Sequence, residues 1–544
     1  MNRYIRIAIV SLIVVFTGIK GHSQNTGNEK ISRALIDSLV VDAVRNERFD
    51  EAWDYIKRIE ECDSLPFNAI DYSTYCCKEY EDYTEWLQLY NRWVKAFPDE
   101  NLKSLFCYKL GVVHYNLENY SLAADNLRPY IEWLQDEDII DTYYRYLYAV
   151  SLFESFQFSL AYDAFDDFFN NVVKEEGVPL KILDTCEMNY SFPLYDFAYT
   201  CFYLGDEKKG LYYLELSKKC GSELAARDLI VLQNSTTFGK EFDIDKRTQS
   251  EFDNLIARYD PKRYLENLDT MDEMEFWTGV REQSPDCKNY LDALQKKRPP
   301  GTLTSAMNEI YSQASSMEDY LAQCHPYVKD DTEDQLEWIL YGPSRPIKDF
   351  RFYPSKDVNA FATPYGQIYI TSGLGERYHY MPSLLVGVCA HETTHYMCDH
   401  SIVSKWQQDQ RERRNDILGG VVAGLYAITM SAAGLYAASE GVAYDDSYWD
   451  NIPKMGGYLV RGFDEDSFVF KFHYSRSQEI EADIVAYRFC EEFGLSGYSY
   501  IMALQLLGNN DVYLLADATD DHPTTNYRVL LLKYLYNKEH STTN

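Results

Sequence analysis

The sequence His391-Glu392-Thr393-Thr394-His395 lies inside an apolar run and decides the expected fold of the C-terminal part of the chain. The run is long enough for a helix, and residues four apart project from the same helical face. The two imidazoles would therefore meet on one face, where two nitrogens can hold a Zn2+ ion. Glu392 would project beside that ion and accept a proton from bound water, so the motif indicates metal-assisted hydrolysis of an amide.

A second charged segment, 475–483, follows at a distance typical of a separate helix. A catalytic zinc site needs three protein ligands and one open position for water. Glu479 is the candidate third ligand, and Asp483 lies on the same helical face, where it can accept a hydrogen bond from the free nitrogen of a zinc-bound histidine. Glu481 would point roughly the other way. The alternative is an ordinary charged amphipathic helix, which the first motif disfavours.

Four blocks of sequence resemble the HtpX-like and CAAX-prenyl-protease-like zinc metallopeptidases, peptidase family forty-eight. The blocks are 359–364 with the strand-like segment after it, the HETTH motif, 475–483, and His522-Pro523 followed by Arg528. The resemblance covers only the C-terminal part of the chain. It implies that one Zn2+ per chain is bound by His391, His395 and Glu479. It also implies that Glu392 is the general base and that Asp483 orients a ligand.

The strand-like segment is Gln367-Ile368-Tyr369-Ile370-Thr371, in which polar and apolar side chains alternate after a glycine. Such alternation predicts a half-buried β-strand. In the family that the chain resembles, a strand of this kind borders the cleft, so an extended peptide could pair with it as a substrate edge strand. The alternative is an interior strand without a role in substrate binding.

Weak repeats run through the N-terminal part of the chain. An aromatic residue three positions before a small one recurs as Phe49 with Ala52, Tyr120 with Ala123, and Phe158 with Ala161. This register resembles tetratricopeptide helix pairs, and the alternative is a generic helical solenoid or bundle. Either predicts stacked helix pairs with a concave face suited to a protein partner.

The sequence therefore predicts a mainly α chain, in which a helical-repeat solenoid precedes an α+β zincin-type domain with a small edge-stranded sheet. The expected parts are a signal peptide at 1–23, tetratricopeptide-like repeats at 24–221, a helical connecting region at 222–302 and a zinc metallopeptidase domain at 303–537. The break Pro299-Pro300-Gly301 precedes the last part. Arg3 and Arg6 before a short apolar run indicate a cleaved secretion signal, so we expect a periplasmic or secreted protein, with an uncleaved anchor as the alternative.

The formal net charge is −33 at pH 7, which repels nucleic acid and anionic headgroups, so neither is an expected partner. The uncharged segment 417–439 has the length of a membrane span. A single crossing there would separate His391 from Glu479, so we expect a packed helix or hairpin, with shallow membrane contact as the alternative. Cys389 and Cys398, which border the HETTH helix, are expected to be small buried residues.

Two further histidines flank the expected site. On a continuous helix His400 would lie about 140° from His395, too far around to be a ligand. His522 precedes Pro523 in a turn-like segment, where its imidazole could take the open zinc position as a switch ligand and keep the site latent. The alternative is that His522-Pro523 only begins the last helix.

The expected function is that of an exported zinc-dependent endopeptidase acting on protein or peptide substrates, with Glu392 as general base. The resemblance further implies a role in envelope protein quality control. The alternative is a repeat-based protein-binding scaffold or chaperone with a latent peptidase domain. The complete ligand set and base favour the enzyme, because a scaffold has no need of Glu392.

Overall fold

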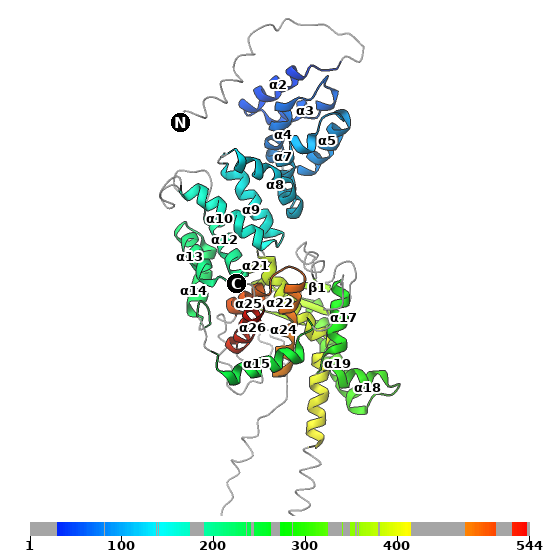
Figure 1. Ribbon diagram of the computed structural model, residues 1–544. Coiled ribbons are helices and arrows are strands. Elements are labelled where there is room, and N and C mark those ends of the chain that lie inside the picture. Colours follow the sequence, from blue (N-terminus) through cyan, green and yellow to red (C-terminus); the bar gives the residue numbers. More distant parts are fainter. Residues whose placement is uncertain are drawn as a thin grey trace, which may run out of the picture. The chain divides into compact units, whose positions relative to one another are not determined.

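The fold is described by a computed structural model. The structure describes residues 30–80, 82–137, 139, 141–174, 190–235, 237–240, 244–262, 272–285, 287–324, 340, 349–353, 356, 358–378, 381–414, 474–507 and 525–540. These residues are mostly helical with one small sheet, which confirms the mainly α fold class (Figure 1). Segments 1–23 and 417–439 lie outside the described residues. Of the helices that are described, none has both the length and the apolar character to cross a membrane.

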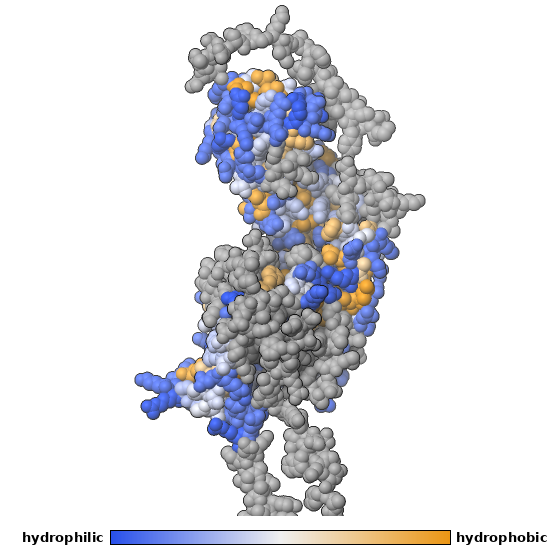
Figure 2. All heavy atoms as spheres, turned by 180° about the vertical axis from the view of Figure 1, so that it is seen from behind, coloured by the Kyte–Doolittle hydropathy of each residue, from blue (hydrophilic) through white to orange (hydrophobic). Residues whose placement is uncertain are grey.

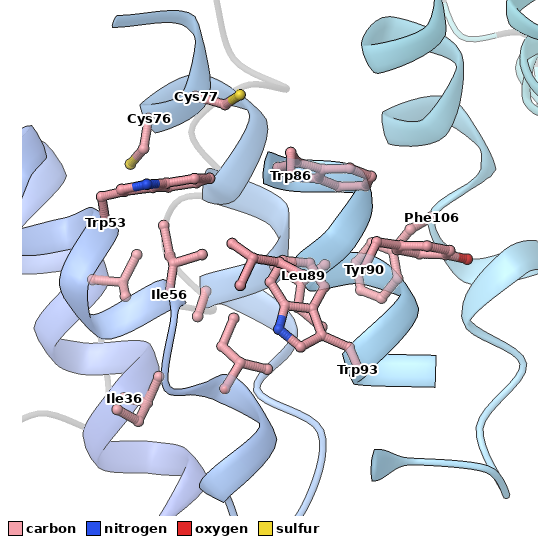
Figure 3. Packing of buried hydrophobic residues seen from close by; sticks show 14 of the residues in the cluster. Ile36, Trp53, Ile56, Cys76, Cys77, Trp86, Leu89, Tyr90, Trp93 and Phe106 are labelled. Carbon is pink, nitrogen blue, oxygen red and sulfur yellow. The ribbon is translucent and has the colours of Figure 1, made fainter. Parts of the chain in front are cut away.

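The chain divides into two compact units, residues 1–133 and 134–544. The helices of the first unit are α2 (Arg33–Arg45), α3 (Phe49–Ile56), α4 (Phe67–Tyr80), α5 (Tyr83–Ala96), α6 (Leu102–Leu105), α7 (Cys107–Asn116) and α8 (Tyr120–Asp136), which runs across the division, with the 3-10 turn η1 (Ile59–Glu61). Large aromatic side chains fill its core, as Figure 3 shows for Trp53, Trp86 and Trp93. Figure 2 shows hydrophilic and hydrophobic residues side by side on its outer surface.

The same turn recurs between paired helices. Glu47, Glu118 and Phe156 have φ of 57°, 59° and 61°, and each lies two residues before the second helix of its pair. In each turn the next backbone N–H returns to the carbonyl five residues earlier, which closes the end of the first helix. The pairs are α2 with α3, α7 with α8, and α9 (Thr142–Glu154) with α10 (Phe158–Lys174). The helix pairs are thus repeated, whereas their assignment to the tetratricopeptide type stays a prediction.

The second unit continues with further helices among the described residues. They are α12 (Ser191–Tyr203), α13 (Glu207–Lys219), α14 (Glu223–Asn234), α15 (Lys246–Tyr259), α17 (Glu273–Gln283), α18 (Lys288–Gln295), α19 (Gly301–Cys324), α21 (Ser372–Tyr378), α22 (Pro382–Met397), α24 (Arg476–Glu492), α25 (Gly497–Leu507) and α26 (Thr525–His540). Helix α22 packs against α24, α25 and the sheet. It therefore lies at the centre of this unit, as Figure 1 shows.

The sheet has three strands in the order β1-β3-β2. Strand β1 (Asp349–Tyr353) is parallel to β3 (Gln367–Thr371), and β2 (Ala360–Ala362) is antiparallel to it. The strand at 367–371 is correctly predicted, but its expected role as a substrate edge strand is wrong. Both backbone edges of β3 are already paired, so no extended peptide can add to it.

The predicted boundary at 221/222 differs from the division at 133/134. The carboxylate of Glu207, at the start of α13, is buried among residues of α25 and α26. Its oxygens accept hydrogen bonds from the Tyr498 hydroxyl at 2.8 Å and the Gln505 amide at 3.0 Å, and they pair with the Lys533 ammonium at 2.6 Å. Burying this charge requires all of these partners at once, so α13 is part of the same unit as the C-terminal helices.

A second buried charge fixes the far end of α24. The Arg488 side chain is 3% exposed and donates to the carboxylates of Asp260, at the end of α15, and Glu539, near the end of α26. A guanidinium held by two carboxylates is fully paired, so its burial is compatible with a stable fold. Helix α24 is thereby attached to α15 and α26 at its C-terminal half.

Candidate metal centre

Helix α22 carries the HETTH motif and is buried on nearly all sides. Pro382 occupies its first turn, where the missing N–H costs nothing. The helix ends at Met397, because Cys398 is the C-cap and Asp399 adopts a left-handed conformation with φ 51°. An apolar helix of this kind belongs in a core. Its two histidines are therefore held within a packed interior rather than on a mobile surface.

Helix α24 brings the candidate third ligand. Its N-terminus has a reciprocal capping box: the Ser475 hydroxyl accepts from the Gln478 N–H at 3.4 Å, and the Gln478 carbonyl oxygen accepts from the Ser475 N–H at 2.9 Å. The cap fixes where the helix begins and hence which way each side chain points. Glu479 follows directly and is directed at α22.

The three candidate ligands converge on one point. The Nε2 atoms of His391 and His395 are 3.1 Å apart, and they lie 3.5 Å and 3.6 Å from the carboxylate oxygens of Glu479. A tetrahedral Zn2+ with bonds of about 2.0–2.1 Å would separate its ligand atoms by about 3.3 Å. All three side chains are buried and their donor atoms form a group that can hold a metal ion. The donor set and its spacing therefore fit zinc.

The outer nitrogen of His391 contacts a buried acid. Its Nδ1 is 3.1 Å from the Asp483 carboxylate and 2.9 Å from the Tyr500 hydroxyl, and that hydroxyl donates to Asp483 at 2.7 Å. Arg528, on α26, donates to both oxygens of Asp483 at 2.7 Å and 2.6 Å. A carboxylate that accepts from Nδ1 leaves Nε2 free to bind a metal.

A glycine allows this arrangement. A Cβ atom on Gly387 would lie 2.8 Å from Cδ2 of Tyr500 and 3.2 Å from its Cα, so α22 and α25 approach more closely here than any side chain would permit. Gly387 is one helical turn before His391. The close approach is what brings the Tyr500 hydroxyl to the outer nitrogen of His391.

The environment of His395 corrects one expectation. His400 is not a member of the ligand set, as predicted, but the reason given was wrong. Because α22 ends at Met397 and Asp399 adopts a left-handed conformation, His400 does not continue the helical periodicity of His395. Its Nδ1 instead lies 2.9 Å from the Nδ1 of His395, and its Nε2 lies 3.3 Å from the carboxylate of Glu481.

Glu392 lies between α22 and the sheet. Its Oε2 accepts a hydrogen bond of 3.1 Å from the backbone N–H of Ala362 on β2. Burial raises the pKa of Glu392 to about 7, which is suitable for a group that must both take and return a proton near neutral pH. Ala362, Thr363, His395 and Tyr474 are among the residues that line a hollow of 10 Å³ beside this site, which has room for about one water molecule.

The charges of the site are arranged around Asp483. Burial disfavours its ionised form, but Arg528 and His391 outweigh burial and hold the pKa of Asp483 below its ordinary value of 3.8. Burial likewise disfavours the imidazolium of His391, but hydrogen bonds to Asp483 and Glu479 raise its pKa to about 9. Without a metal a proton therefore stays on His391, and a bound cation would replace it.

Sequence reasoning missed several of these side chains. Tyr474, which stacks on His395 with ring centroids 3.6 Å apart, and Tyr500 lie in no recognisable motif. Arg528 stands in a block that resembles the family, but no role followed from its position. The sequence also gives no sign that His400 and Glu481 contact the site, because it predicts that both point away from it. His522 lies outside the described residues, so its role as a switch ligand stays a prediction.

Comparison with known proteins gives one match. Residues 342–535 match the model of Peptidase family M48. No curated protein and no solved structure matches the chain. The matched range includes the HETTH helix, Glu479, Asp483 and Arg528, so the family and the converging side chains point to the same place. Residues 342–535 are therefore similar to a peptidase family M48 domain, and this match supports a metallopeptidase of that family.

Proposed function

We propose that this protein is an exported zinc-dependent endopeptidase that hydrolyses peptide bonds with Glu392 as general base. The observation that carries the proposal is the convergence of His391, His395 and Glu479, with Glu392 beside them. When bound, Zn2+ would activate a water molecule and polarise the scissile carbonyl. The Glu392 carboxylate would take the proton from the attacking water and pass it to the leaving amine.

Strand β2 is the better candidate for substrate binding. The N–H of Thr363 donates to the carbonyl of Gln367, and the N–H of Thr371 donates to the carbonyl of Asn359. Alternate residues of a strand bond to the same neighbour, so the backbone of Phe361 also faces β3. Ala360 and Ala362 turn theirs outward, and the N–H of Ala362 meets Glu392. An extended peptide that added to this outer edge would place its backbone beside the base, with affinity that depends little on its sequence.

The test is zinc content and casein cleavage by the mature protein and by its Glu392→Gln variant. Glutamine keeps an oxygen that can accept from Ala362, so the site should stay folded and bind one zinc. It cannot act as a base, so cleavage should be lost. His395→Ala should lose both zinc and activity. Stoichiometric zinc in His395→Ala, or undiminished cleavage by Glu392→Gln, would count against the proposal.

We further propose that the repeated helix pairs recruit protein partners or substrates, and that the enzyme acts in envelope protein quality control. The support is the recurrence of the same helix-turn-helix unit, since stacked pairs present extended surfaces. A scaffold with a latent peptidase domain would bind protein through the same pairs but would not cleave casein. The experiment above therefore also separates the enzyme from the scaffold. His522→Ala tests latency, because loss of a switch ligand should raise the basal rate.

A further inference from the structure

An unusual contact joins the candidate ligand His395 to a histidine that is not a ligand, His400. The Nδ1 atoms of His395 and His400 are 2.9 Å apart, and both side chains are buried. A neutral imidazole carries one proton, on one of its two nitrogens. Two nitrogens at this distance need one proton between them, so one ring donates and the other accepts. The direction of this hydrogen bond decides which nitrogen of His395 is free for a metal.

Zinc binding fixes that direction. If the Nε2 of His395 binds the ion, its proton lies on Nδ1, and His395 donates to His400. His400 then accepts at Nδ1 and carries its own proton on Nε2. That nitrogen lies 3.3 Å from Oε2 of Glu481. An ionised carboxylate accepts hydrogen bonds and cannot donate one, so the nitrogen must be the donor. The three side chains thus form one chain of hydrogen bonds that runs from the metal ligand to a buried carboxylate.

The backbone around His400 is held in place for this contact. Arg281, on α17, donates to the Met397 carbonyl at the end of α22 and to the Asp399 carboxylate. These bonds stabilise the left-handed turn at Asp399 that folds His400 back toward His395. On the other side, the Gln478 amide donates to the His400 carbonyl at 3.2 Å. His400 is therefore fixed from α17 and from α24.

A second metal ion is the competing explanation. Cys398, His400 and Glu481 offer ligand atoms within 4.8 Å of one another. An ion on Nε2 of His400 would move its proton to Nδ1 and reverse the bond to His395. The proton of His395 would then lie on Nε2, the atom that faces His391 and Glu479. With neutral rings, a second ion would thus displace His395 from the first site.

We propose that His400 and Glu481 are positioning residues that hold His395 in the tautomer and orientation required to bind zinc. Helix α24 then supplies three acids to the site: Glu479 as a ligand, Asp483 to orient His391, and Glu481 to orient His395 through His400. The inference rests on the proposed zinc site. Loss of such an outer partner typically weakens metal binding about 10- to 100-fold.

The test compares two variants that differ only in whether they can accept the proton of His395. An Asn side chain at position 400 can place its oxygen near the former Nδ1, whereas a Leu side chain cannot accept at all. Both lose the contact to Glu481, so both are made together with Glu481→Gln, which removes the buried charge. The matched pair is therefore His400→Asn with Glu481→Gln and His400→Leu with Glu481→Gln.

Zinc affinity is measured by competition with a chromophoric chelator, together with the visible spectrum of the Co2+ form and the melting temperature of the metal-free proteins. We expect the double variant His400→Asn with Glu481→Gln to bind zinc with an affinity close to that of wild type. The double variant His400→Leu with Glu481→Gln should bind zinc about 10- to 100-fold more weakly and show an altered Co2+ spectrum. The two double variants should have the same melting temperature without metal. Equal zinc affinity in the two double variants would overturn the inference and leave His400 with a purely structural role.

Cys398→Ala distinguishes the relay from a second metal site. The proposal expects one zinc in wild type and one in Cys398→Ala. Two ions in wild type and one in Cys398→Ala would overturn it in favour of the second site. Wild-type protein that binds no zinc would instead overturn the proposed function, so the two failures can be told apart.

Discussion

Replacing Arg528 by leucine should be among the most damaging single changes to this domain. Asp483 is fully buried, and Arg528 gives it two hydrogen bonds of 2.7 Å and 2.6 Å. Without the guanidinium, the donors that remain to the carboxylate among the described residues are the hydroxyl of Tyr500 and the imidazole of His391. Removing one partner of a buried ion pair costs about 3–5 kcal/mol, so the free energy of unfolding should fall by this amount.

The assay is urea unfolding of the metal-free protein, followed by tryptophan fluorescence. Arg476→Leu is the matched control, because Arg476 is exposed. Its guanidinium lies 3.8 Å from Glu251, a surface pair worth about 0–1 kcal/mol, and 4.5 Å from the centroid of the Tyr527 ring. Adding Asp483→Asn to Arg528→Leu should recover part of the loss, since the unpaired charge is then gone. A loss no larger than in the control, or a double variant no more stable than Arg528→Leu, would refute the reasoning.

The pH dependence of this loss follows from the sign of the pKa shift. The pKa of Asp483 lies below 3.8 in the folded protein. The stabilisation it gives is therefore present above pH 3.8 and is lost as the pH falls through the lower folded value. Without Arg528, only His391 would oppose the effect of burial, so the pKa of Asp483 would be lowered less. The difference in stability between wild type and Arg528→Leu should thus shrink in strong acid.

Three further predictions follow from the packing and charges. Gly387→Ala should push Tyr500 away from His391, destabilise the fold by about 1–3 kcal/mol and weaken zinc binding; unchanged melting and zinc affinity would contradict this. Deleting 24–139, which removes the first unit, should spare cleavage of a short peptide but slow cleavage of large proteins, and equal slowing of both would argue against recruitment. The fall of kcat/KM in acid should come from protonation of Glu392. Its pKa is about 7 and would be lowered by a bound cation, so activity should fall only below pH 7. A fall that begins at higher pH would show that another group is responsible.

The two histidines could be predicted to share a helical face because that depends on helical periodicity alone, whereas the resemblance to a known family was needed to add Glu479 from a separate helix. His391 and His395 are four residues apart, as are Glu479 and Asp483, and any helix brings such pairs to one face. The site around them could not be predicted in the same way. Tyr500 reaches His391 only because α25 lies close to Gly387, and such a contact between distant segments leaves no local pattern.

Two errors have a common physical cause. The alternation in 367–371 predicts a strand but carries no information about its neighbours, and β1 pairs with it from upstream in parallel register. Likewise, helical geometry predicts the position of His400 relative to His395 only on a continuous helix, and the helix is interrupted by the left-handed residue Asp399. The position of Glu207 in the fold was also hidden, since Tyr498 and Lys533 lie far away in sequence.

The attachment of α24 at both ends couples the metal to a distant part of the molecule. Glu479 near the N-terminus of α24 faces the zinc site, and Arg488 in its C-terminal half is held by Asp260 and Glu539. Seating this helix and closing the metal site are then one equilibrium, and thermodynamic linkage makes the effect reciprocal. We expect a change that loosens the ion pairs of Arg488 to lower the affinity for metal, and linkage then requires a bound metal to tighten those pairs by the same factor. Helix α26 contributes Arg528 from its first turn and Glu539 from its last. Release of this single helix would therefore remove the partner of Asp483 and a partner of Arg488 at the same time, and we expect it to weaken metal binding.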